Sequence, residues 1–451
     1  MPLKGRVGRH ASDGRQCQNW KSDQQTVIDL LNRIPATDGG TAGSLGGRIV
    51  AGYASKALYQ AILAFEKKHF PGKAKGFVDP GGAVLAKLEA LANRPPPARK
   101  PNKWDVLTTQ SVRQALKVGV ADTKLSHADA INIVRSTLSD GYITQEEIDD
   151  LRAVAQRSVT LEIRSARLLN SLATTLDFGA DQGKPLELRS DAQKRAAEVV
   201  CKFMEGENNS HWRYLDRYQV GASLLMRIAN PGAINQNDTS LCGPAAVFFG
   251  LAKDQPVEYA QFAIELFELG KAVLGGKRIE PHPYMKAVDV SGKIDQADWM
   301  TLGSLRSSEN YYTAYWSPSD DLTAATEPGK ISDWLELAGY SDVRQETNLI
   351  RDKGGNNLRE ASRLYAAGYL TLLFIDAGML YKATQSKDSG IGDRHWVVLT
   401  DKVQIANDKS VSLKIYTWGD GKRTVPQDPN VPLALSDFLQ NYHGFVAGRP
   451  W

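Results

Sequence analysis

The sequence predicts a multidomain protein in which all-α N-terminal and middle regions precede an α+β region with an antiparallel sheet. Apolar residues recur at helical spacing through most of the first 206 residues, and a proline-rich segment near residue 95 interrupts them. Strand-like apolar runs follow only after residue 368. The chain has 451 residues, 42% of them hydrophobic, and is therefore long enough to build more than one core.

Four segments follow from these patterns. Residues 1–95 are predicted to form a three-helix domain, residues 96–104 a Pro-rich linker, residues 105–205 a helical middle region, and residues 206–451 the α+β domain. The linker is predicted because the run from Asn93 to Pro101 contains four prolines, and proline disrupts both helices and central strands.

The first segment shows three helical patterns. Apolar residues at positions 27, 28, 30, 31 and 34 share one helical face, and residues 55–68 and 83–92 form the other two helices. A Gly-rich turn separates the last two. The segments Ala61-Ile62-x-x-Phe65 and Gly76-x-Val78-Asp79 make residues 20–95 similar to the peptidoglycan-binding-like three-helix domain. That resemblance implies binding of wall glycan; a three-helix adaptor that binds another protein is the alternative.

The middle region is helical by periodicity, over residues 112–120, 126–138, 144–158, 159–176 and 190–206. The run from Ser139 to Glu147 has part of the spacing of a calcium-binding loop. However, Leu138 would occupy a ligand position and has no side-chain oxygen. We therefore expect a helix start in which Thr144 and Glu147 form a capping box.

The last segment alternates helices with strands. A helix begins at Cys242, and further helices are expected over residues 257–274, 330–339 and 357–367. Strands are expected over residues 369–375, 396–405 and 411–418. Residues 406–410 have turn composition and join the last two strands into a hairpin.

The start of the Cys242 helix carries the candidate chemistry. Unpaired N–H groups and the positive helix end are expected to lower the pKa of a cysteine at this position and so favour the reactive thiolate. Gln236 stands six residues earlier and is a candidate donor to an oxyanion formed at an attacked carbonyl. His395 opens a β-rich run and is the candidate base.

The hairpin suggests a partner for this histidine. With the turn centred on residues 407 and 408, cross-strand partners sum to about 815, which places Asp420 opposite His395. A carboxylate there would orient the imidazole toward the thiol. An error of two residues in the turn centre would bring Thr417 opposite His395 instead.

Each candidate residue has a structural alternative. Cys242 is also compatible with a small core residue, His395 with a strand edge, Asp420 with a turn and Gln236 with the surface. The other histidines have poorer contexts, since none precedes an apolar strand-like run. Cys201 lies on an apolar helical face and is expected to be structural.

The candidate residues together resemble the papain-like cysteine peptidase superfamily, in particular its bacteriocin-leader-processing branch. The matching elements are Gln236, the run Cys242-Gly-Pro-Ala, the run His395-Trp-Val-Val, and Asp420. The resemblance implies a papain-like fold for residues 206–451. It also implies that Cys242 attacks an acyl carbon, His395 moves the proton, Asp420 orients His395, and Gln236 with the Cys242 N–H binds the oxyanion.

The two resemblances combined look like an antibacterial effector of type VI secretion. They imply a protein substrate in a target cell, a cognate immunity protein and a secretion-machine partner. Hydrolysis of peptidoglycan stem peptides and a non-catalytic binding module are the alternatives. We expect no cofactor and no metal, because three scattered cysteines suit neither a zinc site nor a disulfide framework.

Composition bears on location and partners as well. The net charge of +4 is mild and does not indicate a nucleic-acid partner. The first residues lack the apolar stretch of a secretory signal, so we expect synthesis in the bacterial cytoplasm without a signal peptide and export by a dedicated machine. No window reaches the roughly 18 apolar residues that a membrane span needs, so no membrane insertion is expected.

Overall fold

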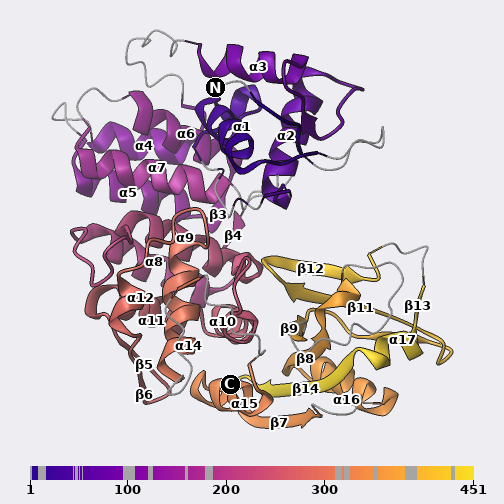
Figure 1. The fold of residues 1–451 in the computed structure, drawn as a ribbon. Helices are drawn as coiled ribbons and strands as arrows, with labels where there is room; N and C mark the ends of the chain where they lie inside the picture. The colour runs from indigo at the N-terminus through magenta and orange to yellow at the C-terminus, as the bar shows by residue number, and fades with distance from the viewer. Residues whose placement is uncertain are drawn as a thin grey trace. The chain divides into compact units, whose positions relative to one another are not determined.

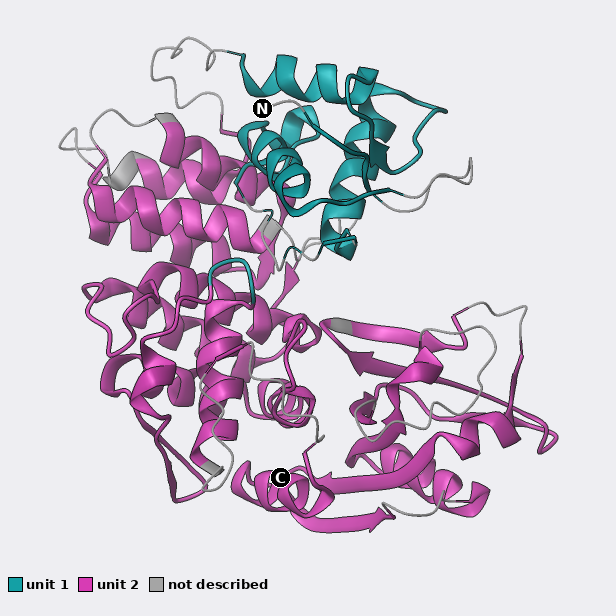
Figure 2. Cartoon of the chain, in the orientation of Figure 1, with its two compact units in different colours: residues 1–102, 291–293 teal, residues 103–290, 294–451 magenta. Residues whose placement is uncertain are grey.

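The computed structural model describes most of the chain, in two compact units (Figure 2). The described residues are 3–8, 17–43, 45, 49, 51–52, 54–94, 107–119, 125–157, 161–177, 186–309, 317–318, 326–348, 354–380, 394–427 and 432–451. Unit 1 comprises residues 1–102 and 291–293, and unit 2 comprises residues 103–290 and 294–451. Residues 95–106, which include the predicted linker, lie outside the described residues.

Unit 1 contains the three predicted helices. They are α1 (Lys21–Arg33), α2 (Lys56–His69) and α3 (Ala83–Ala92), with a short β1 (Val7–Gly8) paired to β2 (Phe77–Val78). Ser55 caps α2 by accepting from the Leu58 N–H. The buried carboxylate of Glu66 accepts from the backbone N–H groups of Lys75 and Gly76 and thereby fixes the turn before β2.

The first half of unit 2 is helical, as predicted. Its elements are α4 (Gln110–Gly119), α5 (His127–Leu138), β3 (Tyr142–Ile143), α6 (Gln145–Arg157), α7 (Ile163–Asp177), β4 (Leu186–Glu187) and α8 (Asp191–Glu205). At the start of α6, the Thr144 N–H donates to Glu147 Oε2 and the Glu147 N–H donates to Thr144 Oγ1. The capping box is confirmed, and it accounts for the residues that resembled a calcium loop.

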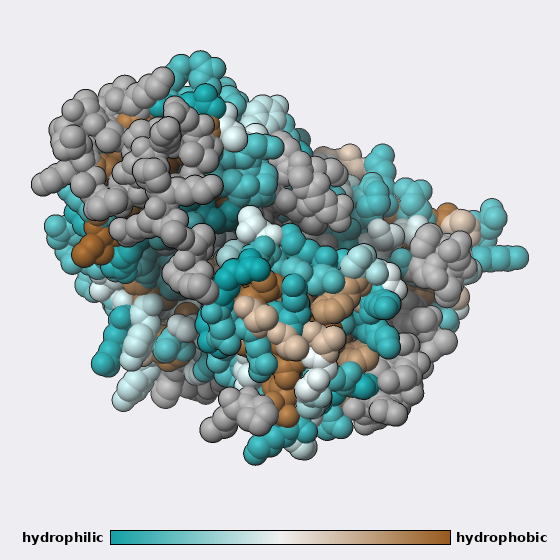
Figure 3. Space-filling model, turned by 90° about the horizontal axis from the view of Figure 1, so that it is seen from above, coloured by the Kyte–Doolittle hydropathy of each residue, from teal (hydrophilic) through white to brown (hydrophobic). Residues whose placement is uncertain are grey.

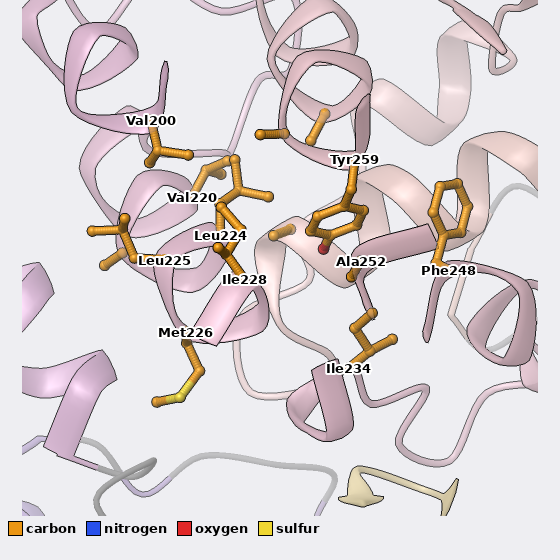
Figure 4. Close-up of a cluster of buried hydrophobic side chains, with 14 of the residues drawn as sticks. Val200, Val220, Leu224, Leu225, Met226, Ile228, Ile234, Phe248, Ala252 and Tyr259 are labelled. Carbon is orange, nitrogen blue, oxygen red and sulfur yellow. The ribbon is translucent and has the colours of Figure 1, made fainter. Parts of the chain in front are cut away.

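The hydrophobic core continues past residue 205. Helix α9 (Arg217–Ala229) packs against α7 and α8, and α11 (Pro256–Leu269) packs against α8. Figure 4 shows Val200, Leu224 and Tyr259 from these helices in one buried cluster with Phe248 of α10 (Cys242–Asp254). The predicted boundary at residues 205 and 206 therefore falls inside one continuous core.

Short elements connect α11 to the sheet. They are β5 (Ala272–Leu274), β6 (Lys277–Ile279), α12 (Pro283–Lys286), α13 (Gln296–Asp298), a π-helical turn (Trp299–Gly303), α14 (Ser304–Glu309) and α15 (Pro328–Leu337). The helix expected over residues 257–274 ends five residues early, at Leu269. Gly270 has a φ of 66° there and closes α11 in the left-handed conformation, after which the chain forms a hairpin.

The C-terminal half of unit 2 contains an antiparallel sheet of eight strands, as predicted in outline. The strand order is β10-β11-β9-β8-β14-β7, and β12 and β13 also pair with β11. The strands are β7 (Ser341–Thr347), β8 (Leu370–Asp376), β9 (Arg394–Leu399), β10 (Gln404–Ala406), β11 (Ser410–Thr417), β12 (Asp420–Val425), β13 (Leu433–Ala434) and β14 (Tyr442–Arg449).

Helices cover both faces of this sheet (Figure 1). Trp396 and Val398 of β9 belong to the same core cluster as α10 and α15, whereas Val397 and Leu399 belong to the cluster with α16 (Gly355–Ala366) and α17 (Leu435–Gln440). Alternation along the strand produces this division. Burial on both faces explains why β8 and β9 are almost continuously apolar in sequence.

The hairpin before the end of β11 has the predicted turn, but its far end differs from the prediction. Asn407 and Asp408 both have positive φ, and β10 pairs with β11 beyond them. Strand β11 stops at Thr417, because Trp418 and Gly419 reverse the chain with φ of 46° and 74°. Asp420 therefore lies on β12, opposite Thr417, and not on an extension of β11 opposite His395.

The exposed surface is mainly polar, with small apolar groups among polar residues on the face drawn in Figure 3. Large exposed apolar side chains among the described residues are dispersed along the chain, for example Trp20, Ile163 and Tyr284. Over the same residues, every helix is too short or too polar to cross a bilayer.

Candidate active site

Cys242 is the first residue of α10, as the sequence predicted. The helix is almost wholly buried, and it packs on β9 and β11 through Phe249, whose ring stacks on Tyr416 at 4.3 Å. This packing places the start of α10 beside the His395–Trp396 peptide. The backbone N–H groups of Trp396, Gly243 and Cys242 itself lie close enough to the Cys242 sulfur to lower the pKa of its thiol.

Burial raises the pKa of the Cys242 thiol, which is only 6% exposed. The three N–H groups and the positive charge of Arg306 lower this pKa, but burial outweighs them. The expectation of a lowered pKa is therefore wrong for the structure as it stands, because desolvation of a sulfur anion costs more than the helix end returns.

His395 lies on β9, one residue before Trp396. Its Nε2 is 2.7 Å from the Thr417 hydroxyl oxygen, and its ring stacks on Trp418 with centroids 4.4 Å apart and planes 15° apart. These two contacts fix the ring from the end of β11. The imidazole lies on the sheet face that packs against α16 and α17, as its contacts with Thr417 and Trp418 and its pairing with Ile375 show. Cys242 lies on the opposite face, with Trp396, so the structure does not bring the thiol and the imidazole together.

The imidazole of His395 is neutral over most of the pH range. Burial and the nearby positive Arg423 lower its pKa to about 3. The guanidinium carbon of Arg423 lies 5.6 Å from the centroid of the Trp418 ring, on which His395 stacks. An imidazole with a pKa of about 3 is neutral near pH 7 and is a weak base in this conformation, since a general base works best with a pKa near the working pH.

The lowered pKa of His395 predicts a pH dependence of stability. An unfolded histidine titrates near 6.5. Between that value and about 3, the unfolded chain binds a proton at this position that the folded chain does not. Stability should therefore fall with decreasing pH, by about 1.4 kcal/mol per pH unit from this residue. Urea unfolding of the wild type and of His395→Gln from pH 4.5 to 7 should show a shallower slope for the variant. A constant difference between the two proteins at every pH would contradict the expectation.

Gln236 is buried in the loop that leads to α10. Its carbonyl oxygen accepts from the N–H and the hydroxyl of Thr239, which closes a turn. Its side-chain Oε1 is buried and has no hydrogen-bond partner within the described part of the chain. This oxygen is an acceptor, so its unused capacity suits a ligand group that donates a hydrogen bond; binding of an oxyanion would use the side-chain N–H instead.

Three contacts hold this loop against the sheet and the helices. Tyr416 donates its hydroxyl to the Ile234 carbonyl at 2.8 Å, and the Asn235 N–H donates to Asp298 at 2.9 Å. Gly419 approaches the Asn235 side chain so closely that an added Cβ would lie 2.7 Å from it. The turn that ends β11 and the Gln236 loop are therefore packed together.

Asp420 is placed by its backbone alone. It lies opposite Thr417 at the start of β12, and its side chain lies outside what the structure describes. The side chain that bonds to the histidine is that of Thr417, which the sequence analysis gave as the alternative to Asp420. A hydroxyl can fix the ring orientation, but unlike a carboxylate it adds no negative charge to stabilise an imidazolium.

Several groups near the site carried no clear signal in the sequence. Arg306 and Thr326 come from segments 64 and 84 residues after Cys242 and meet near its helix start. His443 lies on β14, followed by an apolar run, so its context was underestimated; it pairs with Asp376 at 2.9 Å, both buried. The glycines of β14 concealed its strand character.

The remaining cysteines differ from Cys242. Burial raises the pKa of Cys201 to about 12, and its side chain lies in the core, in agreement with a structural role. Cys17 is also buried, against Phe77 in unit 1. Among the described residues, no three His, Cys, Asp or Glu side chains are grouped as a metal ion would require.

Comparison with protein-family models, with curated proteins and with solved structures gives no match for this chain.

Proposed function

We propose that the protein is a thiol-dependent acyl hydrolase, a protease or a deamidase, with Cys242 as nucleophile and His395 as base. The observation that carries this proposal is the position of the Cys242 sulfur. It lies at the first turn of α10, where the N–H groups of the helix start and of Trp396 favour the thiolate by lowering the pKa of the thiol.

In the proposed reaction, the sulfur attacks the acyl carbon while the thiol proton passes to His395. Because the His395 ring is bonded to Thr417 on the sheet face opposite Cys242, this transfer requires the ring to turn toward α10 and take the proton on Nδ1. The carbonyl oxygen gains the negative charge, and the Cys242 N–H and the Gln236 amide would donate to it. The tetrahedral species expels an amine, which takes the proton from His395, and water then releases the acid from the thioester. Asp420 is proposed to support His395 together with Thr417.

The biological role follows from the family resemblances and remains a proposal. The chain would be made in the bacterial cytoplasm and delivered by type VI secretion into a target cell. A protein of that cell would be the substrate, and an immunity protein would protect the producer. Under this proposal, unit 2 adopts a papain-like arrangement.

One observation favours peptidoglycan as a second candidate substrate. Unit 1 contains a pocket of about 160 Å³ with aromatic and charged lining. Its walls include Phe70, Phe77, Lys73 and Asp79. Aromatic faces and polar groups together suit a wall fragment. A non-catalytic shell is the third possibility, and loss of thiol dependence would favour it.

Expression in bacteria tests the proposal and separates the substrates. The full chain should be toxic in one compartment, and Cys242→Ala should remove the toxicity while the protein accumulates normally. Toxicity in the cytoplasm would favour a protein substrate. Toxicity only with an added export signal, together with release of muropeptides from sacculi, would favour the wall. Undiminished killing by Cys242→Ala would exclude the enzyme.

A further inference from the structure

Arg306 is held next to the start of α10 by a buried threonine. It lies on α14, and its Nη1 donates to Thr326 Oγ1 at 3.0 Å. The carbonyl oxygen of the same threonine, which is 1% exposed, accepts from Trp396 Nε1 at 2.8 Å. One residue therefore connects the arginine to the strand that carries His395.

Thr326 also lies directly against the residue after the nucleophile. A Cβ built on Gly243 would be 2.4 Å from Thr326 Oγ1 and 2.7 Å from its Cβ. No side chain larger than that of glycine fits there unless Thr326 moves. The hydroxyl that fixes Arg306 is thus packed on the first turn of α10, where the Cys242 sulfur is located.

The positive charge of Arg306 acts on Cys242. It lowers the pKa of the thiol, second among the opposing effects after the Trp396 N–H. His395 is uncharged at neutral pH, since its pKa is lowered to about 3, and so supplies no positive charge in the resting site. A thiolate formed here therefore depends on Arg306 and on backbone dipoles until the proton reaches the imidazole.

The other charged groups that face α10 are few and are largely satisfied. Strand β9 contributes Arg394, which lies over Phe374, because His395 lies on the other face of the sheet. Strands β8 and β14 contribute the pair of Asp376 and His443, and β11 contributes Tyr416, whose phenol has its pKa raised by burial. Tyr259 of α11 likewise has a raised pKa, and beyond Tyr416 lies the buried ion pair of Arg227 and Asp298. Helix α15 directs only uncharged residues inward, which are Pro328, Ile331, Trp334 and Leu335.

From this geometry we infer that Arg306 is a positioning residue whose charge stabilises the Cys242 thiolate during attack. The inference rests on the proposed function. The S–H bond breaks, and its proton goes to His395 after the ring turns from the opposite sheet face toward α10. The negative charge on sulfur lies near the guanidinium until it moves to the carbonyl oxygen. Thr326 is the hydroxyl that keeps the guanidinium in place.

The test is the pH dependence of Cys242 alkylation by iodoacetamide in the full chain, resolved by peptide mass spectrometry. Arg306→Met should raise the apparent pKa of Cys242 by about one unit and lower its rate at pH 8 about tenfold. Arg306→Lys should stay within about threefold of the wild type, because it keeps the charge. Arg363→Met, which removes an exposed arginine from α16, is the matched control and should change nothing.

A second variant tests the same inference if Arg306→Met does not fold. Thr326→Val removes the hydroxyl but keeps the volume and the carbonyl bond to Trp396, and it should shift the apparent pKa in the same direction by a smaller amount. Suppose that wild-type Cys242 reacts faster than Cys201. An unchanged pH dependence of Cys242 alkylation in a folded Arg306→Met or Thr326→Val protein then overturns the inference about Arg306 and leaves the proposed function standing. If wild-type Cys242 reacts no faster than Cys201, both the proposed function and the inference about Arg306 fail.

Discussion

Replacement of Cys242 by alanine should lower the rate of substrate hydrolysis by a factor on the order of 10⁴ or more, since it removes the atom that forms the covalent intermediate. The stability of the protein should change little. The side chain is small and lies at the start of α10, where alanine fits the helix equally well. The measurement is turnover of whichever substrate the toxicity and sacculus assays identify, with circular dichroism as a check on folding.

The matched control for this prediction is Cys201→Ala. That residue lies in the core of α8, is fully buried and has no neighbour with a catalytic role, so its loss should lower stability slightly and leave turnover near that of the wild type. Equal losses of activity in both variants would indicate a general structural effect and would count against Cys242 as the nucleophile.

The second large effect is expected from the buried ion pair beneath the Gln236 loop. Arg227 donates to both carboxylate oxygens of Asp298, at 2.7 and 2.5 Å, and also lies 3.1 Å from Asp295. Burial raises the pKa of Asp298, and the arginine counteracts that effect. Arg227→Met should lower the free energy of unfolding by about 3–5 kcal/mol, because it leaves the buried carboxylate of Asp298 without its cation.

The same change should also reduce activity. Asp298 accepts the Asn235 N–H next to Gln236, so an altered carboxylate position displaces the proposed oxyanion donor. Urea unfolding and turnover of Arg227→Met, Asp298→Leu and the double variant form the test. The double variant should be more stable than the sum of the single changes predicts, because it leaves no unpaired buried charge. Strict additivity, or a loss below 1 kcal/mol in Arg227→Met, would contradict this account of the pair.

The sequence contains clear signals for the local elements of this fold. Helical spacing placed α2 and α3 within one or two residues of their observed bounds, and the positive-φ residues Asn407 and Asp408 marked the hairpin turn. The edge strand β7 was missed because its run Ser-Asp-Val-Arg-Gln-Glu-Thr is mostly exposed and lacks an apolar face. Strand β14 was missed because glycines at 444 and 448 weaken its pattern.

The site was predictable only where neighbours in sequence are neighbours in space. Cys242 at a helix start and His395 at a strand start follow from local patterns. The contact between His395 and Thr417 depends on where β11 ends. The strand ends at Thr417 because Trp418 and Gly419 form a turn. Tertiary contacts between distant segments, such as Arg306 with Thr326, leave no periodic trace in a single sequence.

The direction of the Cys242 pKa shift shows the same limit. The helix start was visible in the sequence, and its N–H groups do lower the thiol pKa. The extent of burial was not visible, because it arises from Trp396, Tyr416 and the helices that surround α10. Desolvation grows with every such neighbour and reverses the net shift.

The central claim is that His395 controls the reactivity of the Cys242 sulfur, and the rate of Cys242 alkylation measures this most directly. Iodoacetamide labelling at pH 7.5, read at each cysteine by mass spectrometry, should modify Cys242 before Cys201 in the wild type. In His395→Gln, the Cys242 rate should fall at least tenfold while the Cys201 rate stays the same. Equal Cys242 rates in the two proteins, with folding intact, would contradict the nucleophile and base pair on which the account depends.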